Sequence, residues 1–231
     1  MIDVRPFDDL GSADHGWLQA RHHFSFGGYY DPRRTGWGDL LVWNDDTIAV
    51  NRGFPLHPHA DMEIITYVRE GAITHRDSLG NKGRTRAGDV QVMSAGTGIR
   101  HSEFNLEDEV TRIFQIWIRP DAAGGEPSWG TRPCPRTAGA GGRVTLASGD
   151  PGDDALPIRA RARVMGGTLA KGRLIGLDVD PARHLYLVPA TGSVRVNGVV
   201  VGTRDGAAIT DVAHLEIEAL EEAEIVLVDA R

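Results

Sequence analysis

Short runs rich in Val, Ile, Tyr and Trp recur along the chain, separated by Gly, Asp and Asn. The runs return at intervals of roughly 8–12 residues without helical periodicity, which is typical of antiparallel β-structure. Turn residues fit between them, and we expect tight turns at Glu70-Gly71, Ala87-Gly88-Asp89 and Asn44-Asp45-Asp46. The pattern therefore predicts an all-β protein.

A stretch rich in Pro, Gly and Ala lies between Arg119 and Gly142 and divides the strand pattern in two. The 231 residues accommodate two domains of about 100 residues each. Tyr67–Ile73 and Tyr186–Val194 share a strand-turn-strand pattern, which favours a duplicated unit. We expect an N-terminal barrel over residues 1–130, a linker over 131–143 and a C-terminal barrel over 144–231.

Composition excludes several classes of function. The net charge of −7 disfavours direct binding to nucleic acid, which needs clustered Lys and Arg. No apolar run reaches the roughly 18 residues of a membrane span, and the first twenty residues lack the apolar stretch of a signal peptide, so we expect a cytoplasmic protein. Cys134 is the only cysteine and is assigned no role, so any bound metal has nitrogen and oxygen ligands.

Two pairs of metal-binding residue types occur at a spacing of two. His57 and His59 form the first pair, and His101 and Glu103 form the second. Alternate residues of a strand face the same side, so each pair can point into a barrel, and neighbouring strands would bring the pairs together. Three imidazoles and a carboxylate suit a divalent transition metal and leave positions for water, dioxygen or substrate. Glu63 has a suitable strand position too and remains a rival carboxylate.

These residues resemble the motifs of the cupin superfamily and, more closely, of the pirin family. The cupin pattern is met by His57, His59, Glu63 and Gly71, and then by Gly88, His101 and Asn105. The pirin pattern is met by Phe24-Ser25-Phe26, Tyr29-Tyr30-Asp31, His57-Pro58-His59, Asp61-Met62-Glu63, Asp77-Ser78-Leu79-Gly80-Asn81 and Met93-Ser94-Ala95-Gly96-Thr97-Gly98-Ile99-Arg100-His101-Ser102-Glu103.

The resemblance implies a bicupin, with two cupin-like barrels and a metal site in the N-terminal barrel only. It places the metal ligands at His57, His59, His101 and Glu103. Glu63 is expected just behind the ligands, orienting a histidine through its other ring nitrogen, although a plain surface position suits it equally. His75 is expected as another neighbour of the ligands.

The resemblance also implies an activity like that of the bacterial quercetin 2,3-dioxygenases. One divalent ion, Fe(II) by preference, with Cu, Mn, Co, Ni or Zn as alternatives, would bind a small aromatic hydroxy-ketone and dioxygen. Glu103 would act as the catalytic residue that takes the substrate proton. The alternatives are a metal- or redox-responsive regulator that acts through a protein partner, and a structural cupin with an idle metal. We expect a monomer that contacts neither nucleic acid nor membrane.

Overall fold

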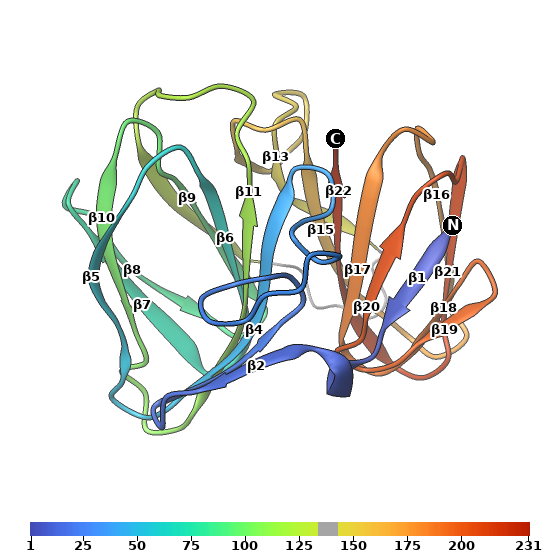
Figure 1. Cartoon of the computed structure of the whole chain (residues 1–231), viewed down its shortest axis with the longest axis horizontal. Coiled ribbons are helices and arrows are strands. Elements are labelled where there is room, and N and C mark those ends of the chain that lie inside the picture. Colours follow the sequence, from blue (N-terminus) through green and yellow to red (C-terminus); the bar gives the residue numbers. More distant parts are fainter. Residues whose placement is uncertain (134–142) are drawn as a thin grey trace.

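The computed structural model describes residues 1–133 and 143–231, which form two β-barrels side by side (Figure 1). Each barrel consists of a seven-stranded sheet and a four-stranded sheet. This arrangement confirms the predicted all-β fold with two cupin-like barrels. Among the described residues, no helix is long and apolar enough to cross a membrane.

The sheets of the N-terminal barrel have the strand orders β12-β9-β6-β11-β4-β3-β2 and β5-β10-β7-β8. In chain order these strands are β2 (Gly11–Asp14), β3 (Leu18–His22), β4 (Leu40–Ile48), β5 (Gly53–His59), β6 (Glu63–Glu70), β7 (Ala72–Asp77), β8 (Lys82–Arg86), β9 (Asp89–Ser94), β10 (Ile99–Phe104), β11 (Thr111–Ile118) and β12 (Ser128–Pro133).

The sheets of the C-terminal barrel have the orders β1-β20-β17-β22-β15-β13-β14 and β16-β21-β18-β19. Their strands are β1 (Ile2–Arg5), β13 (Val144–Ser148), β14 (Leu156–Pro157), β15 (Arg163–Leu169), β16 (Leu174–Asp178), β17 (His184–Thr191), β18 (Val194–Val196), β19 (Val199–Val201), β20 (Gly206–Ile209), β21 (His214–Ala219) and β22 (Ala223–Ala230).

The two large sheets pack against each other through a shared apolar core. Trp43 on β4 and Phe114 on β11 meet Tyr186 on β17 in this core, and the rings of Trp43 and Tyr186 lie 5.6 Å apart. All three side chains are fully buried. Because successive residues of a strand face opposite sides, the opposite faces of these sheets point into the two barrels.

The interiors of the barrels differ in chemistry. The C-terminal barrel is filled by an apolar cluster that includes Leu187, Val194, Ile217 and Leu227. The N-terminal barrel has apolar clusters at its two ends and a layer of buried polar side chains that includes Glu103. The polar interior is therefore the candidate place for chemistry.

The turn predicted at Asn44-Asp45-Asp46 is wrong, because β4 runs without interruption through all three residues. Each of them is buried. Asn44 accepts a hydrogen bond from His22, while Asp45 forms ion pairs with Arg69 and Arg204. Turn propensity is overridden here by partners that lie far away in the sequence.

The structure departs from the predicted domain boundaries at two places. Residues 131–133, assigned to the linker, belong to β12 and pair with β9. β1, assigned to the N-terminal barrel, pairs with β20 instead and lies among the C-terminal strands (Figure 1). The rest of the predicted linker up to residue 142, including Cys134, lies outside the described residues.

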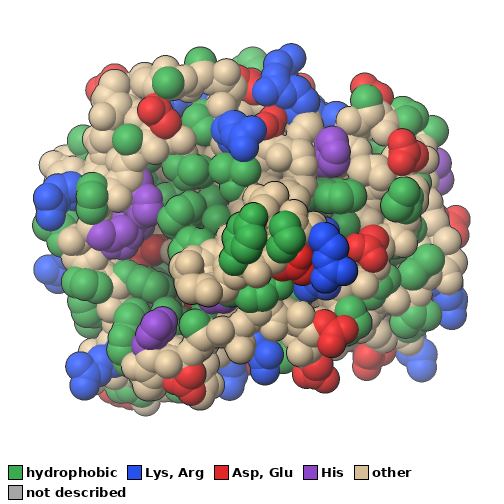
Figure 2. Space-filling model, viewed as in Figure 1, with side chains coloured by type: hydrophobic (Ala, Val, Ile, Leu, Met, Phe, Trp, Pro, Cys, Tyr) green, Lys and Arg blue, Asp and Glu red, His purple; other side chains and the backbone are tan. Residues whose placement is uncertain are grey.

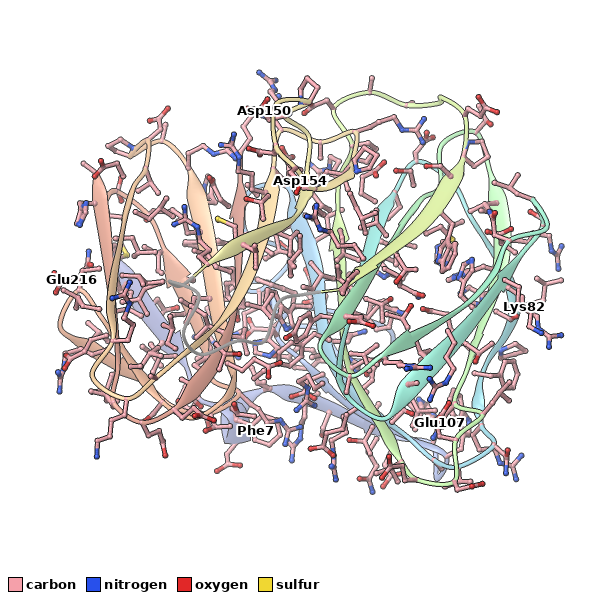
Figure 3. All side chains as sticks on the ribbon, turned by 180° about the vertical axis from the view of Figure 1, so that it is seen from behind. Phe7, Lys82, Glu107, Asp150, Asp154 and Glu216 are labelled. Atoms are coloured by element: carbon pink, nitrogen blue, oxygen red, sulfur yellow. The ribbon has the colours of Figure 1, made fainter. Side chains whose placement is uncertain are left out.

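After β1 the chain crosses to the first barrel through a 3-10 helix, η1 (Phe7–Asp9). Figure 3 shows Phe7 at the junction of the two halves. The guanidinium group of Arg204 lies 3.9 Å from the centre of the Phe7 ring, and that of Arg21 lies 5.0 Å from it. Phe7 is thus held between cations from both barrels.

Candidate metal centre

β5 and β10 bring three histidines to one place. The two strands are antiparallel, with His101 opposite His57 and Ile99 opposite His59. The ring of His101 lies 4.4 Å from that of His57 and 5.1 Å from that of His59, and the rings of His57 and His59 are 4.8 Å apart. One ligand nitrogen of each histidine lies within 4.8 Å of the other two. The structure thus brings together the three histidines that the sequence analysis singled out.

The hydrogen bonding of these imidazoles fits a metal ion. His101 is 2% exposed, and neither ring nitrogen has a hydrogen-bond partner among the described residues. Nδ1 of His57 lies 2.7 Å from the carbonyl oxygen of Pro55, to which it donates, so Nε2 keeps a free lone pair. A buried nitrogen without a partner costs free energy, and a coordinated cation would remove that cost.

Burial also keeps the imidazoles of His59 and His101 neutral, which is the form that binds a metal. Burial lowers the pKa of His59 to about 4, with the neighbouring His57 adding to the effect. The pKa of His101 is lowered to about 2, first by burial and then by the nearby His57, His59 and His75. Protons therefore compete only weakly for these nitrogens near neutral pH.

Glu103 lies deeper in the barrel, and its carboxylate accepts three hydrogen bonds. Oε1 accepts from Thr66 at 3.1 Å and from Gln91 at 2.6 Å, and Oε2 accepts from Gln115 at 2.8 Å. Burial raises the pKa of Glu103 to about 7, against the opposing effect of these hydrogen bonds. The side chain is 1% exposed and can change its charge near neutral pH.

Glu103 and His75 form a second group with His101. Ligand atoms of these three residues lie within 4.8 Å of one another, so the two groups overlap at His101. Nε2 of His75 lies 3.0 Å from Oδ2 of Asp77, and the ring of His75 stacks on Trp129 at 4.8 Å. The structure thus places His75 beside His101 and Glu103, with its orientation set by Asp77.

The prediction that Glu63 orients a histidine is wrong. Glu63 shares the face of β6 that carries Ile65 and packs against the second barrel. Its Oε2 accepts a hydrogen bond from Ser94, and its Oε1 lies 3.7 Å from Nε of Arg159. Motif spacing alone did not show on which face of β6 this residue lies.

Sequence reasoning also missed the aromatic side chains around the histidines. Trp117 on β11 packs edge-on against His59 at 5.0 Å, and Phe26 packs edge-on against Trp117 at 5.4 Å. Figure 2 shows histidine side chains gathered on this face of the N-terminal half, next to a hollow lined by hydrophobic groups. The available signals were the motif Phe24-Ser25-Phe26 and the spacing of two between Gln115 and Trp117, which places them on one face of β11.

The arrangement combines imidazole nitrogens, a carboxylate and an apolar approach. Nitrogen and oxygen ligands of this kind accept several divalent transition metals. Among the described residues, both groups of possible ligands lie in the N-terminal barrel.

Comparisons with known proteins agree with this geometry. One family model, described as Pirin, matches residues 3–118, and another, described as quercetinase C-terminal cupin domain, matches residues 145–230. The chain is 65% identical to a pirin-like protein of Caulobacter vibrioides over 231 residues, covering 100% of both chains. It is 40% identical to the quercetin 2,3-dioxygenase of Escherichia coli over 230 residues, covering 99% of this chain and 98% of that one.

A solved structure is similar over the whole chain. The bacterial pirin YhhW from Escherichia coli, in complex with nickel(II), matches with a TM-score of 0.94 and 40% identity. The match covers 100% of this chain and 99% of that chain.

Proposed function

Because this chain belongs to the pirin family, we propose that it is a metal-dependent dioxygenase that cleaves flavonols such as quercetin with dioxygen. The observation that carries the proposal is His101, whose two buried nitrogens lack hydrogen-bond partners among the described residues at the meeting point of two ligand groups. A purely structural barrel would have no need to bury such a group.

We assign the ion to His57, His59, His101 and Glu103. The three imidazoles meet from β5 and β10, and Glu103 lies on the inner side of His101. A bound divalent ion would polarise the hydroxy-ketone of the substrate and favour its reaction with dioxygen. Fe(II) is our preferred ion, with Ni(II), Mn(II), Co(II), Cu(II) and Zn(II) as alternatives.

In this proposal Glu103 takes the proton of the substrate hydroxyl group. Its pKa of about 7 suits a base that works near neutral pH. Oε2 accepts one hydrogen bond where Oε1 accepts two, so Oε2 is the freer oxygen to receive the proton. Both atoms of dioxygen enter the product, one ring carbon leaves as carbon monoxide, and the proton returns to the new carboxylate.

Oxygen uptake tests the proposal. The iron-loaded protein should consume dioxygen with quercetin and release carbon monoxide, and Glu103→Gln should lose most of this activity, on the order of 100-fold. Glu107→Gln is the control, because Glu107 pairs with Arg84 at the edge of the barrel (Figure 3). Uptake no faster than that of free iron would reject the enzyme and favour a regulator acting through a protein partner.

A further inference from the structure

A cavity of about 380 Å³ opens beside the metal centre. This volume is in the range of sites that bind small molecules. Its walls include three aromatic and three polar side chains: Phe26, Tyr29, Phe54, His22, Asp46 and Gln115. We call it the Asp46 cavity.

The Asp46 cavity shares a wall with the metal centre. Gln115 lines the cavity and donates a hydrogen bond to Glu103. Phe26 also lines it and packs against Trp117, which in turn packs against His59. The cavity therefore lies next to the metal centre, with Gln115 and Phe26 in the wall between them.

Asp46 lines the cavity as a buried carboxyl group with an unused oxygen. It is 2% exposed, and its Oδ1 has no hydrogen-bond partner among the described residues. Its neighbour on the strand, Asp45, differs in this respect, because it is paired with Arg69 and Arg204. Asp46 thus belongs to the cavity wall and has a buried oxygen without a partner among the described residues, a combination typical of a binding position.

The charge state of Asp46 suits a hydrogen bond to a neutral ligand. Burial raises its pKa well above the usual range, and the carboxylates of Asp45 and Glu103 raise it further against the effect of Arg69. The neutral carboxyl group can both donate and accept a hydrogen bond. A phenolic hydroxyl group has the same two capacities.

A second polar group faces the same space. Nδ1 of His22 lies 2.8 Å from Oδ1 of Asn44, to which it donates, so Nε2 carries the lone pair. Burial lowers the pKa of His22, although the bond to Asn44 opposes this. His22 is therefore a neutral acceptor beside the carboxyl group of Asp46.

The aromatic wall is built to hold a flat ring. Phe26 and Tyr29 are joined by the Gly27-Gly28 turn and flank His22 at ring distances of 5.5 and 6.3 Å. The ring of Tyr29 lies directly over Gly11, where a Cβ atom would come within 2.3 Å of it. Only glycine leaves room for the ring at this place.

We propose that the Asp46 cavity receives the aromatic ring of the substrate that lies away from the hydroxy-ketone, and that Asp46 hydrogen-bonds a hydroxyl group on that ring. Asp46 is then the residue that selects substrates hydroxylated on the remote ring. The inference rests on the proposed function, because the metal centre must hold the hydroxy-ketone for the remote ring to reach this cavity.

Two flavonols test the inference. Quercetin carries two hydroxyl groups on its remote ring, and galangin lacks both but keeps the same hydroxy-ketone and fused rings. Affinity is measured by calorimetry on the iron-loaded protein without oxygen. We expect the unmodified protein to prefer quercetin by about tenfold, since a lost hydrogen bond inside a cavity costs roughly this factor.

Two variants of Asp46 make the test specific. Asp46→Val should reduce the preference to about one and leave the affinity for galangin within about twofold, because only the hydrogen bond is lost. Asp46→Asn should keep most of the preference, since its amide also donates and accepts. Metal content and melting temperature check that each variant is folded and loaded. If Asp46→Val does not fold, Asp46→Ala replaces it and should reduce the preference to about one for the same reason.

The outcomes separate the two proposals. An unchanged preference in Asp46→Val, or no preference in the unmodified protein, overturns the role of Asp46 even if oxygen uptake is normal. The expected loss of preference without any oxygen uptake would support the role of Asp46 and reject the dioxygenase.

Discussion

Replacing His101 by leucine should stabilise the metal-free protein but make the metal-loaded protein less stable than the unmodified one. In the metal-free protein the two buried nitrogens of His101 lack partners among the described residues, and each such group costs about 1–3 kcal/mol. Leucine has a similar size and no polar atom. Allowing for lost ring contacts with His57 and His75, we expect His101→Leu to raise the free energy of unfolding of the metal-free protein by about 1 kcal/mol.

The metal should favour the unmodified protein instead. An ion at about 1,000 times its dissociation constant adds about 4 kcal/mol to the free energy of unfolding. For a chain of this length that corresponds to a rise in melting temperature of roughly 8–16 °C. His101→Leu removes a ligand shared by both groups and should lose most of this gain.

The assay is urea unfolding of both proteins, first with a chelator and then with nickel(II). The expected result is that the variant is the more stable protein in chelator and the less stable one in nickel. A variant that is less stable by more than about 1 kcal/mol in chelator would refute the reasoning about unsatisfied nitrogens. A variant that gains as much from nickel as the unmodified protein would refute the ligand assignment.

Three further predictions concern stability. Folding lowers the pKa of His101 from 6.5 to about 2, so the folded state binds fewer protons than the unfolded state. The free energy of unfolding of the metal-free protein should therefore be fully present above pH 6.5 and fall by about 2 kcal/mol between pH 6.5 and 5.0. Urea midpoints measured across this range should fall less in His101→Leu. Gly83→Ala places a Cβ 2.1 Å from an indole carbon of Trp129 on β12 and should lower the free energy of unfolding by about 1–3 kcal/mol. A Cβ at Gly28 would have no atom within 4 Å, so Gly28→Ala should change the free energy of unfolding by no more than about 0.5 kcal/mol. Equal melting temperatures for the Gly83 and Gly28 variants would contradict this difference in packing. Arg159→Ala leaves the buried carboxylate of Glu63 without its cation and should lower the free energy of unfolding by about 1–2 kcal/mol, whereas an unchanged urea midpoint would mean that this pair contributes nothing.

The all-β architecture was predictable because strand periodicity is a local property. The meeting of His57, His59 and His101 was predictable as well, since a spacing of two on a strand places side chains on one face. Strand pairing was harder, because β1 pairs with a strand near the other end of the chain. Local patterns contain no information about such distant partners.

Buried polar residues were the main source of error. Asn44 and its two neighbours were predicted as a turn from their residue types alone. That prediction failed because Asn44 and Asp45 have partners on other strands, which the local sequence does not show. Glu63 was placed behind the histidines from its position in the motif. The face of β6 on which it lies depends on how β6 packs, which the motif does not show. The three donors to Glu103 come from β6, β9 and β11, and ordinary Thr and Gln residues carry no signal until these strands are assembled.

The pairing of β1 with β20 has a consequence for synthesis on the ribosome. Ile2 lies opposite Ile209, so β1 waits for a partner that is synthesised about 200 residues later. At about 5–20 residues per second this takes roughly 10–40 s. During that time the N-terminal barrel can close while β1 stays unpaired, and the C-terminal barrel completes its seven-stranded sheet only when β20 captures β1.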